Sequence, residues 1–216
     1  MTNIATEPVF SGFTQHDFDT FTVEGLEPRM EAIRSRIQPK FRAIGHALTE
    51  DMSMLAGQEM FLHIAQHLRR KTNAPVDTWM AFAPNKRGYK MHPHFQIGLF
   101  DDHLFMWLAY IYELPEKQAI ADRFLASVPL LRETIPQEYE VSFDHMRKDA
   151  VKFADLGKEE LKTALERFRN IKKTELLIGR RFAANDPILR DGTEFLEAAK
   201  ETFETLMPLY HLSLSR

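Results

Sequence analysis

The stretch HFQIGLFDDHLFMWLAYIY, residues 94–112, decides the fold class of this 216-residue chain. Its aromatic and aliphatic side chains favour two strands, at 94–100 and 104–112, because such side chains pack well on a pleated surface. Asp101 and Asp102 separate the two runs, and aspartate is frequent in tight turns and poor in strands. The stretch therefore predicts an antiparallel hairpin.

A third strand is expected on the N-terminal side of this hairpin. Residues 78–82 are similarly rich in strand-forming side chains. Residues 85–88, Asn-Lys-Arg-Gly, are typical of a turn that would join them to the strand beginning at His94. The economical arrangement is an antiparallel meander. Residues 60–68 fit a helix or a strand equally well.

The N-terminal third has a helical pattern. Thr14 is suited to cap a short helix, and Pro28 suits the first turn of a second helix, where its missing N–H costs nothing. Pro39 is expected to break or restart that helix, and Gly57 to end the helical region.

The C-terminal half alternates between helical and strand patterns. Helices are expected over 117–131, after a cap at Asp155, and from Thr193 onward. Strands are expected at 139–143 and 176–182. With helices at both ends flanking a mostly antiparallel central sheet, the chain is predicted to be an α+β protein.

Composition restricts the classes of function. The chain has 28 Lys and Arg against 31 Asp and Glu, and this formal net charge of −3 argues against a generally basic nucleic-acid binder. With no cysteine, disulfides, thiolate metal sites and cysteine nucleophiles are excluded. The longest apolar run, 104–112, is about half the length of a membrane-spanning helix. Since no Gly-, Ser- or Pro-rich linker occurs, we expect one domain over 1–216. The short apolar run predicts a soluble protein with no membrane partner, and the absence of cysteine agrees with a cytoplasmic location.

The charge is unevenly distributed along the chain. Between Phe61 and His94 there are six Lys and Arg against one acid, Asp77, so this segment has a net charge of +5 and the remainder −8. The same segment holds four of the nine histidines. Two clusters within it supply the candidate ligand-binding residues: His63, His67, Arg69, Arg70, Lys86, Arg87, Tyr89, Lys90, His92 and His94.

Each cluster is expected to present its side chains on a common side. If the first cluster is a strand, His63, His67 and Arg69 project from one face, and if it is a helix, its two histidines lie one turn apart. The second cluster starts in a turn and runs into a strand, on which Lys90, His92 and His94 share a face. If the clusters lie on adjacent strands, their charges converge.

Such a surface is suited to bind an anion. Arginine offers a planar fork of donors, lysine a point charge, and imidazole a further N–H. Gly88 allows a close approach of the backbone, and Tyr89 supplies an aromatic plane. The predicted partner is a phosphate-bearing small molecule, a nucleotide or a nucleic acid.

Other interpretations stay open. The charges could form a solvated sheet edge that meets an acidic protein, which would make the chain an interaction or structural module. A histidine could act as general acid or base on an anionic substrate, although no nucleophile motif or paired carboxylates accompany it. His63 and His67 together with His92 and His94 could coordinate a metal such as zinc, but Arg69 and Arg70 would repel a cation, so we assign no metal site. The sequence does not identify a cofactor. Trp79 and Trp107 are expected in the core or on a sheet face rather than as a stacking platform.

Several strings in the chain resemble one known family. They are FDTF at 18–21, GLEPRM at 25–30, IQPKF at 37–41, HIAQHLRR at 63–70, DTW at 77–79, NKRGYK at 85–90, HFQIG at 94–98 and IYE at 111–113. In these strings the chain resembles the YktB-like family of uncharacterised bacterial proteins. The resemblance implies a single α+β domain, similar in shape to the catalytic domains of biotin ligases and class II synthetases. It assigns no activity, cofactor or catalytic residue.

Overall fold

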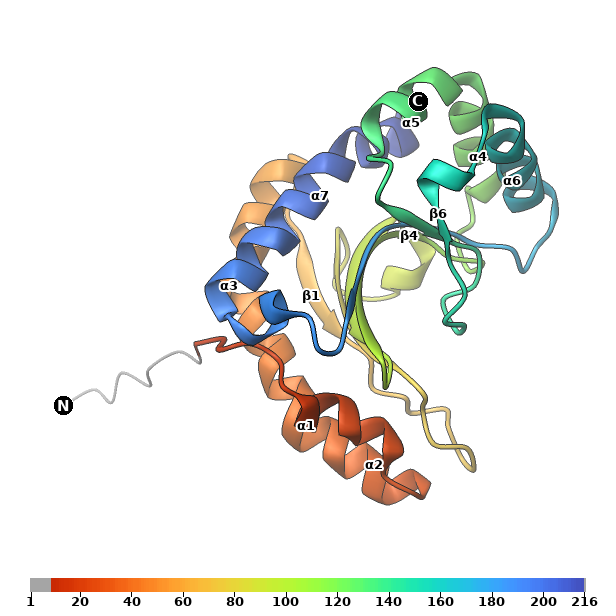
Figure 1. The fold of residues 1–216 in the computed structure, drawn as a ribbon. Helices are drawn as coiled ribbons and strands as arrows, with labels where there is room; N and C mark the ends of the chain where they lie inside the picture. Colours follow the sequence, from red (N-terminus) through yellow and green to blue (C-terminus); the bar gives the residue numbers. More distant parts are fainter. Residues whose placement is uncertain (1–8, 216) are drawn as a thin grey trace.

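The centre of the protein is a seven-stranded antiparallel sheet with the order β1-β2-β3-β4-β7-β5-β6 (Figure 1). The computed structural model describes residues 9–215. The strands are β1 Phe61–Ile64, β2 Thr78–Ala83, β3 His94–Leu99, β4 His103–Tyr110, β5 Glu140–Ser142, β6 Val151–Lys152 and β7 Leu176–Ala183. Strands β2, β3 and β4 form the predicted meander, and β1, from the stretch that fitted a helix or a strand, pairs with β2 at its edge. The α+β class is confirmed.

The hairpin predicted from residues 94–112 is formed by β3 and β4. Their register runs from His94 opposite Ala109 to Leu99 opposite Leu104. The Phe100 N–H donates to the His103 carbonyl, 2.9 Å away, across the two aspartates of the turn. The pair lies at the centre of the sheet, flanked by β2 and β7.

The helices lie before, between and after the strands. They are α1 Gln15–Phe18, α2 Leu26–Ala32, α3 Gln38–Ala56, α4 Lys117–Ala126, α5 Val128–Thr134, α6 Lys158–Asn170 and α7 Gly192–Leu214. The two long helices α3 and α7 pack side by side on one face of the sheet (Figure 1). Within residues 9–215, no helix combines the length and apolarity that crossing a membrane requires.

The N-terminal helices begin and end close to where the sequence predicts. Thr14 precedes α1, and its N–H donates to the Asp17 carboxylate at 2.7 Å. Between α2 and α3 the chain makes a π-helical turn over Ile33–Ile37, after which Pro39 stands in the first turn of α3. Gly57 ends α3 in the left-handed region at a φ of 64°.

Two predicted helix boundaries in the C-terminal half are wrong, and a third differs from the structure by one residue. Asp155 does not cap α6, which begins at Lys158 because Asp155 itself ends a 3-10 turn. Helix α7 begins at Gly192, one residue before the predicted start at Thr193, and Asp191 caps it. The single helix expected over 117–131 is divided at Ser127, between α4 and α5.

The two faces of the sheet carry different side chains. Alternate residues such as Met80, Phe95 and Leu108 point toward α3 and α7 and join the main hydrophobic core. The opposite face, which we call the open face, carries a smaller apolar cluster that includes Trp79 and Trp107. The long connections between strands fold over this open face, and the candidate site lies there.

Candidate functional site

The first basic cluster leaves the sheet after β1. The strand ends at Ile64, and the chain then turns at His67, whose φ of 52° lies in the left-handed region. The Arg70 N–H donates to the His67 carbonyl at 3.0 Å and closes this turn. The prediction that His63, His67 and Arg69 share one face of a regular element is therefore wrong, because only His63 belongs to the strand.

The second cluster lies in the connection between β2 and β3. Gly88, at a φ of 68°, leads into a 3-10 turn over Tyr89–Met91. Of the residues Lys90, His92 and His94, only His94 belongs to β3. The prediction that these three side chains share a strand face is wrong, because the chain turns instead of extending at this point.

The two clusters nevertheless meet at a cavity of about 410 Å³ on the open face of the sheet. We call this cavity the Trp79 pocket. The part of its lining that comes from the predicted residues is His67, Arg69, Arg70, Tyr89 and Lys90. Trp79 of β2 adds an aromatic wall, and Met146, from the connection after β5, adds an apolar one. Five of the ten predicted residues thus border one cavity.

Trp79 forms the floor of this pocket. Its indole N–H donates to the Tyr89 hydroxyl at 2.8 Å, and the Lys90 Nζ lies 5.1 Å from the ring centroid. The His67 ring meets the indole edge-on, with the centroids 5.7 Å apart. Burial raises the pKa of Tyr89 to about 12, so its hydroxyl is neutral at physiological pH. The tryptophan is on a sheet face, as predicted, and it also lines a pocket.

Gly98 of β3 makes room for this floor. A Cβ atom at this position would lie 2.7 Å from the Cβ of Trp79 and would also clash with the Phe105 ring. Only a residue without a side chain lets the two aromatic residues of β2 and β4 approach across β3. The indole position therefore depends on a glycine that does not itself line the pocket.

Three cations surround the pocket, and they differ in exposure. The Arg69 side chain is 89% exposed, whereas that of Lys90 is 22% exposed. Glu113, which follows β4, faces both: its Oε1 lies 4.0 Å from the Arg69 Nη2 and 3.8 Å from the Lys90 Nζ. Arg70 donates to the Asn73 carbonyl at 3.5 Å. Lys90 is the cation that the fold holds most closely against the aromatic floor.

The histidines near the pocket are neutral at physiological pH. Burial, with Arg70 and Lys90 nearby, lowers the pKa of His67 to about 4. Burial also lowers the pKa of His63, whose ring stacks on Tyr89 at 4.8 Å and donates to the Asn85 carbonyl. These rings can offer one N–H or one lone pair each, but no positive charge.

His94 is fully buried beneath the pocket. Its Nδ1–H donates to the His92 carbonyl at 2.7 Å, and its Nε2 accepts from the Gln96 amide at 2.8 Å. Burial lowers the pKa of His94 to about 3. With both ring nitrogens engaged and no exposed surface, His94 supports the site without touching a ligand.

Lys86, Arg87 and His92 do not line the pocket. The Lys86 Nζ lies 5.2 Å from the centroid of the Phe61 ring, and Arg87 is exposed on the turn before the 3-10 segment. His92 is hydrogen-bonded to the side chain of Asn85. The convergence predicted for the two clusters is therefore partial.

From the sequence, Asp77 is distinguished only as the one acid of the basic segment. It is 0% exposed, and no donor from residues 9–215 reaches either carboxylate oxygen within hydrogen-bond distance. Burial raises its pKa to about 6, against the opposing effects of His145, Arg70 and Lys90. Buried polar groups are nearly always hydrogen-bonded, so this carboxyl group is exceptional.

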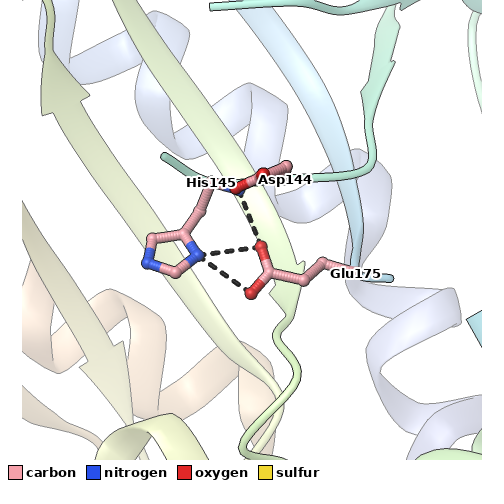
Figure 2. A group of neighbouring side chains, drawn as sticks. All are labelled: Asp144, His145 and Glu175. Atoms are coloured by element: carbon pink, nitrogen blue, oxygen red, sulfur yellow. Dashed lines mark hydrogen bonds and ion pairs between the residues drawn. The ribbon is translucent and has the colours of Figure 1, made fainter. Parts of the chain in front are cut away.

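A second group of polar side chains lies beside Trp79 and contains Asp144, His145 and Glu175 (Figure 2). Glu175, just before β7, is 1% exposed and accepts the His145 backbone N–H at 2.7 Å. The same carboxylate accepts the His145 Nδ1–H at 2.8 Å and the Tyr112 N–H at 3.2 Å. Glu175 thus fixes the orientation of the imidazole. No periodic signal in the sequence indicates this contact.

These three residues are also the only group in the described part of the chain with a spacing that suits a metal ion. Their ligand atoms lie within 4.8 Å of one another. The hydrogen bonds of Glu175 account for that proximity, because its oxygens and the Nδ1 of His145 are already paired. We therefore assign no metal to this group.

A larger cavity, of about 540 Å³, lies against α6, away from the basic segment. Its charged lining has three acids, Asp144, Glu159 and Glu160, against two bases, Arg167 and Lys173. Because acids outnumber bases there, this cavity offers no electrostatic selection for an anion.

The fold and the pocket define an α+β protein in which helices cover one face of an antiparallel sheet and the other face carries a polar pocket around a tryptophan. Residues 13–210 match the family described as a domain of unknown function, DUF1054, and the chain belongs to this family.

The relatives match over nearly their whole length. A UPF0637 protein of Shouchella clausii is 57% identical over 204 residues, covering 94% of this chain and 95% of the relative. A UPF0637 protein of Oceanobacillus iheyensis is 52% identical, covering 94% and 97% of the two chains. One from Listeria monocytogenes serotype 4a is 47% identical, covering 95% and 98%. These matches agree with the resemblance to the YktB-like family.

Proposed function

We propose that this protein binds a small phosphate-bearing ligand in the Trp79 pocket. One observation carries the proposal: Arg69, Arg70 and Lys90, from two separate connections, border the same cavity above an aromatic floor. Arginine and lysine are the side chains best suited to phosphate oxygens. The neutral His67 and Tyr89 add donors without adding charge.

The geometry favours a small molecule over a nucleic-acid strand. A cavity of about 410 Å³ is of the size that encloses metabolites. A strand would need a continuous basic track, and Lys86 and Arg87 do not line the pocket. The charge of the segment is therefore divided between the pocket and an exposed turn. The absence of cysteine from the sequence fits the cytoplasmic location that we propose with this function.

The two alternatives predicted from the sequence receive less support. A catalytic role for His94 conflicts with its burial and its two hydrogen bonds. An interaction module would use exposed charges such as Arg87, but would not need Lys90 to be held over Trp79. Small-ligand binding accounts for both the cations and the aromatic floor.

Calorimetric titration of the full chain with pyrophosphate tests this proposal. We expect saturable binding by the wild type and a Kd about 10-fold or more higher for the double variant Arg70→Ala, Lys90→Ala, because charge-assisted hydrogen bonds are lost. Arg87→Ala is the matched control. It removes a cation from the same segment but outside the pocket, and we expect its Kd to stay within about 2-fold of the wild type.

Two results would contradict the proposal. One is the absence of binding heat in the wild type, and the other is an Arg87→Ala variant that is weakened as much as the double variant. A parallel titration with a short single-stranded oligonucleotide distinguishes the partner classes. Tight oligonucleotide binding that depends on Arg87 would favour a nucleic-acid partner instead.

A further inference from the structure

One carboxylate faces two of the three cations that line the Trp79 pocket. Glu113 stands in the connection between β4 and α4, where the Leu114 N–H donates to the Ile111 carbonyl at 3.1 Å and turns the chain. Its Oε1 lies 3.8 Å from the Lys90 Nζ and 4.0 Å from the Arg69 Nη2. Glu113 is not part of the pocket lining, and it is connected to the pocket through these two cations.

The ion pairs of Glu113 are long. A charge-assisted hydrogen bond joins nitrogen and oxygen at about 2.7–2.9 Å. In the same chain, the Lys40 Nζ lies 2.6 Å from the Asp17 Oδ2. The Oε1 of Glu113 is buried, and no donor from residues 9–215 reaches it within hydrogen-bond distance. Its attraction to Lys90 and Arg69 therefore lacks the direct hydrogen bonds that would fix it.

A carboxylate in this position competes with the anionic group of a ligand. In the empty pocket, its charge balances part of the charge of Lys90 and Arg69, so a phosphate group meets a reduced attraction. The phosphate oxygens can form the short hydrogen bonds to these cations that the carboxylate does not form. Because the Glu113 side chain is 29% exposed, water screens part of the competing attraction.

We propose that Glu113 is an internal counter-ion that sets the affinity of the Trp79 pocket, and that a phosphate group replaces it at Lys90 and Arg69 when the ligand binds. This inference rests on the proposed function, since it concerns the same pocket and the same class of ligand. It requires the ligand to reach only the two cations, which line the pocket, and not Glu113 itself.

The variant Glu113→Gln tests this role, because it removes the charge and keeps the shape of the side chain. In calorimetric titrations of the full chain with pyrophosphate, we expect its Kd to be about 5-fold lower than that of the wild type. Misfolding would weaken binding, so it does not imitate this result. Glu116→Gln is the matched control: it removes the same charge from an exposed position in the same connection. We expect its Kd to stay within about 2-fold of the wild type.

The same substitution in a Lys90→Ala background tests whether the effect passes through Lys90. If Glu113 pairs with this lysine, removing the carboxylate has less to release once the lysine is absent. We expect the gain in pyrophosphate affinity to drop below about 2-fold in this background. A gain that keeps its full size there would overturn the pairing with Lys90.

The possible failures are distinct. If the wild type binds pyrophosphate and Glu113→Gln has an unchanged or higher Kd, the inference is overturned and the proposed function stands. Equal gains in Glu113→Gln and Glu116→Gln would reveal an effect of net charge alone, and they would also overturn the inference. The absence of pyrophosphate binding by the wild type would overturn the proposed function and the inference with it.

Discussion

The carboxyl group of Asp77 makes an unfavourable contribution to the stability of the folded protein at neutral pH. Burial raises its pKa to about 6, from the model-compound value of 3.8. The folded state therefore holds the proton more tightly than the unfolded chain does. Ionising this group in its buried position costs about 3 kcal/mol, a cost that a function at this site would explain.

The sign of this contribution predicts a pH-dependent gain in stability from Asp77→Asn. Because the folded pKa is raised, the wild-type carboxyl group loses its favourable contribution as the pH rises from 3.8 through about 6. The free energy of unfolding of the variant, relative to the wild type, should therefore increase by up to about 3 kcal/mol between pH 4 and pH 7. Urea denaturation at several pH values measures this difference.

The difference between the wild type and Asp77→Asn is the quantity to measure, because other groups change stability with pH in the opposite sense. The pKa values of His67 and His94 are lowered to about 4 and about 3, so these histidines reduce stability as the pH falls below 6.5. Both histidines are present in the wild type and in Asp77→Asn, and their contributions cancel in the difference. A difference that is constant across this pH range would contradict the burial of an unpaired Asp77 carboxyl group.

At the scale of the elements, the start of α7 depends on one side chain. The Asp191 Oδ1 accepts the N–H groups of Thr193 and Glu194 at 2.8 and 3.0 Å. These donors have no partner within the helix, and the carboxylate also interacts favourably with the helix dipole. The position of this long helix on the sheet is thus reinforced at its first turn.

We expect Asp191→Ala to lower the free energy of unfolding by about 1 kcal/mol, the usual cost of a lost helix cap. Asp155→Ala is the control, because the sequence suggests a cap at Asp155 whereas the structure places it in an exposed 3-10 turn. Its change should stay within about 0.5 kcal/mol. Equal losses for the two variants in thermal or chemical denaturation would argue against the cap at Asp191.

The central hairpin could be predicted from the sequence because its signals are local. Residues 94–112 contain two runs of strand-forming side chains and, between them, two aspartates that favour a turn. The turn at Tyr89–Met91 could not be predicted in this way, since the same residues also fit an extended strand. Its conformation depends on the contacts of Tyr89 and Lys90 with Trp79, which the sequence does not reveal.

The candidate site was predictable only in part for the same reason. Charge composition alone led to Arg69, Arg70 and Lys90. Asp77 could be recognised as unusual because it is the one acid in the basic segment. The pairing of His145 with Glu175 joins two connections 30 residues apart, and no spacing rule links such positions.

At the scale of the whole molecule, the sheet separates the main hydrophobic core from the pocket in which we propose ligand binding. Its helix-covered face contributes to the main core, which includes side chains from Phe10 to Tyr210. This continuity supports the proposal that residues 1–216 form one domain. The open face carries a smaller apolar cluster, and beside it lie the cations and the aromatic floor of the Trp79 pocket. Variation in the connections can therefore alter the pocket without disturbing the core.

The most direct test of the proposed phosphate site uses NMR of the full chain. The signals of the two tryptophan indole N–H groups report where a phosphate group binds. Trp79 and Trp107 both lie on the open face, but only Trp79 lines the pocket. On titration with pyrophosphate, we predict a saturable shift of the Trp79 indole signal and a stationary Trp107 signal. A Trp79 signal that stays fixed up to saturating pyrophosphate, or a shift confined to Trp107, would contradict the central claim.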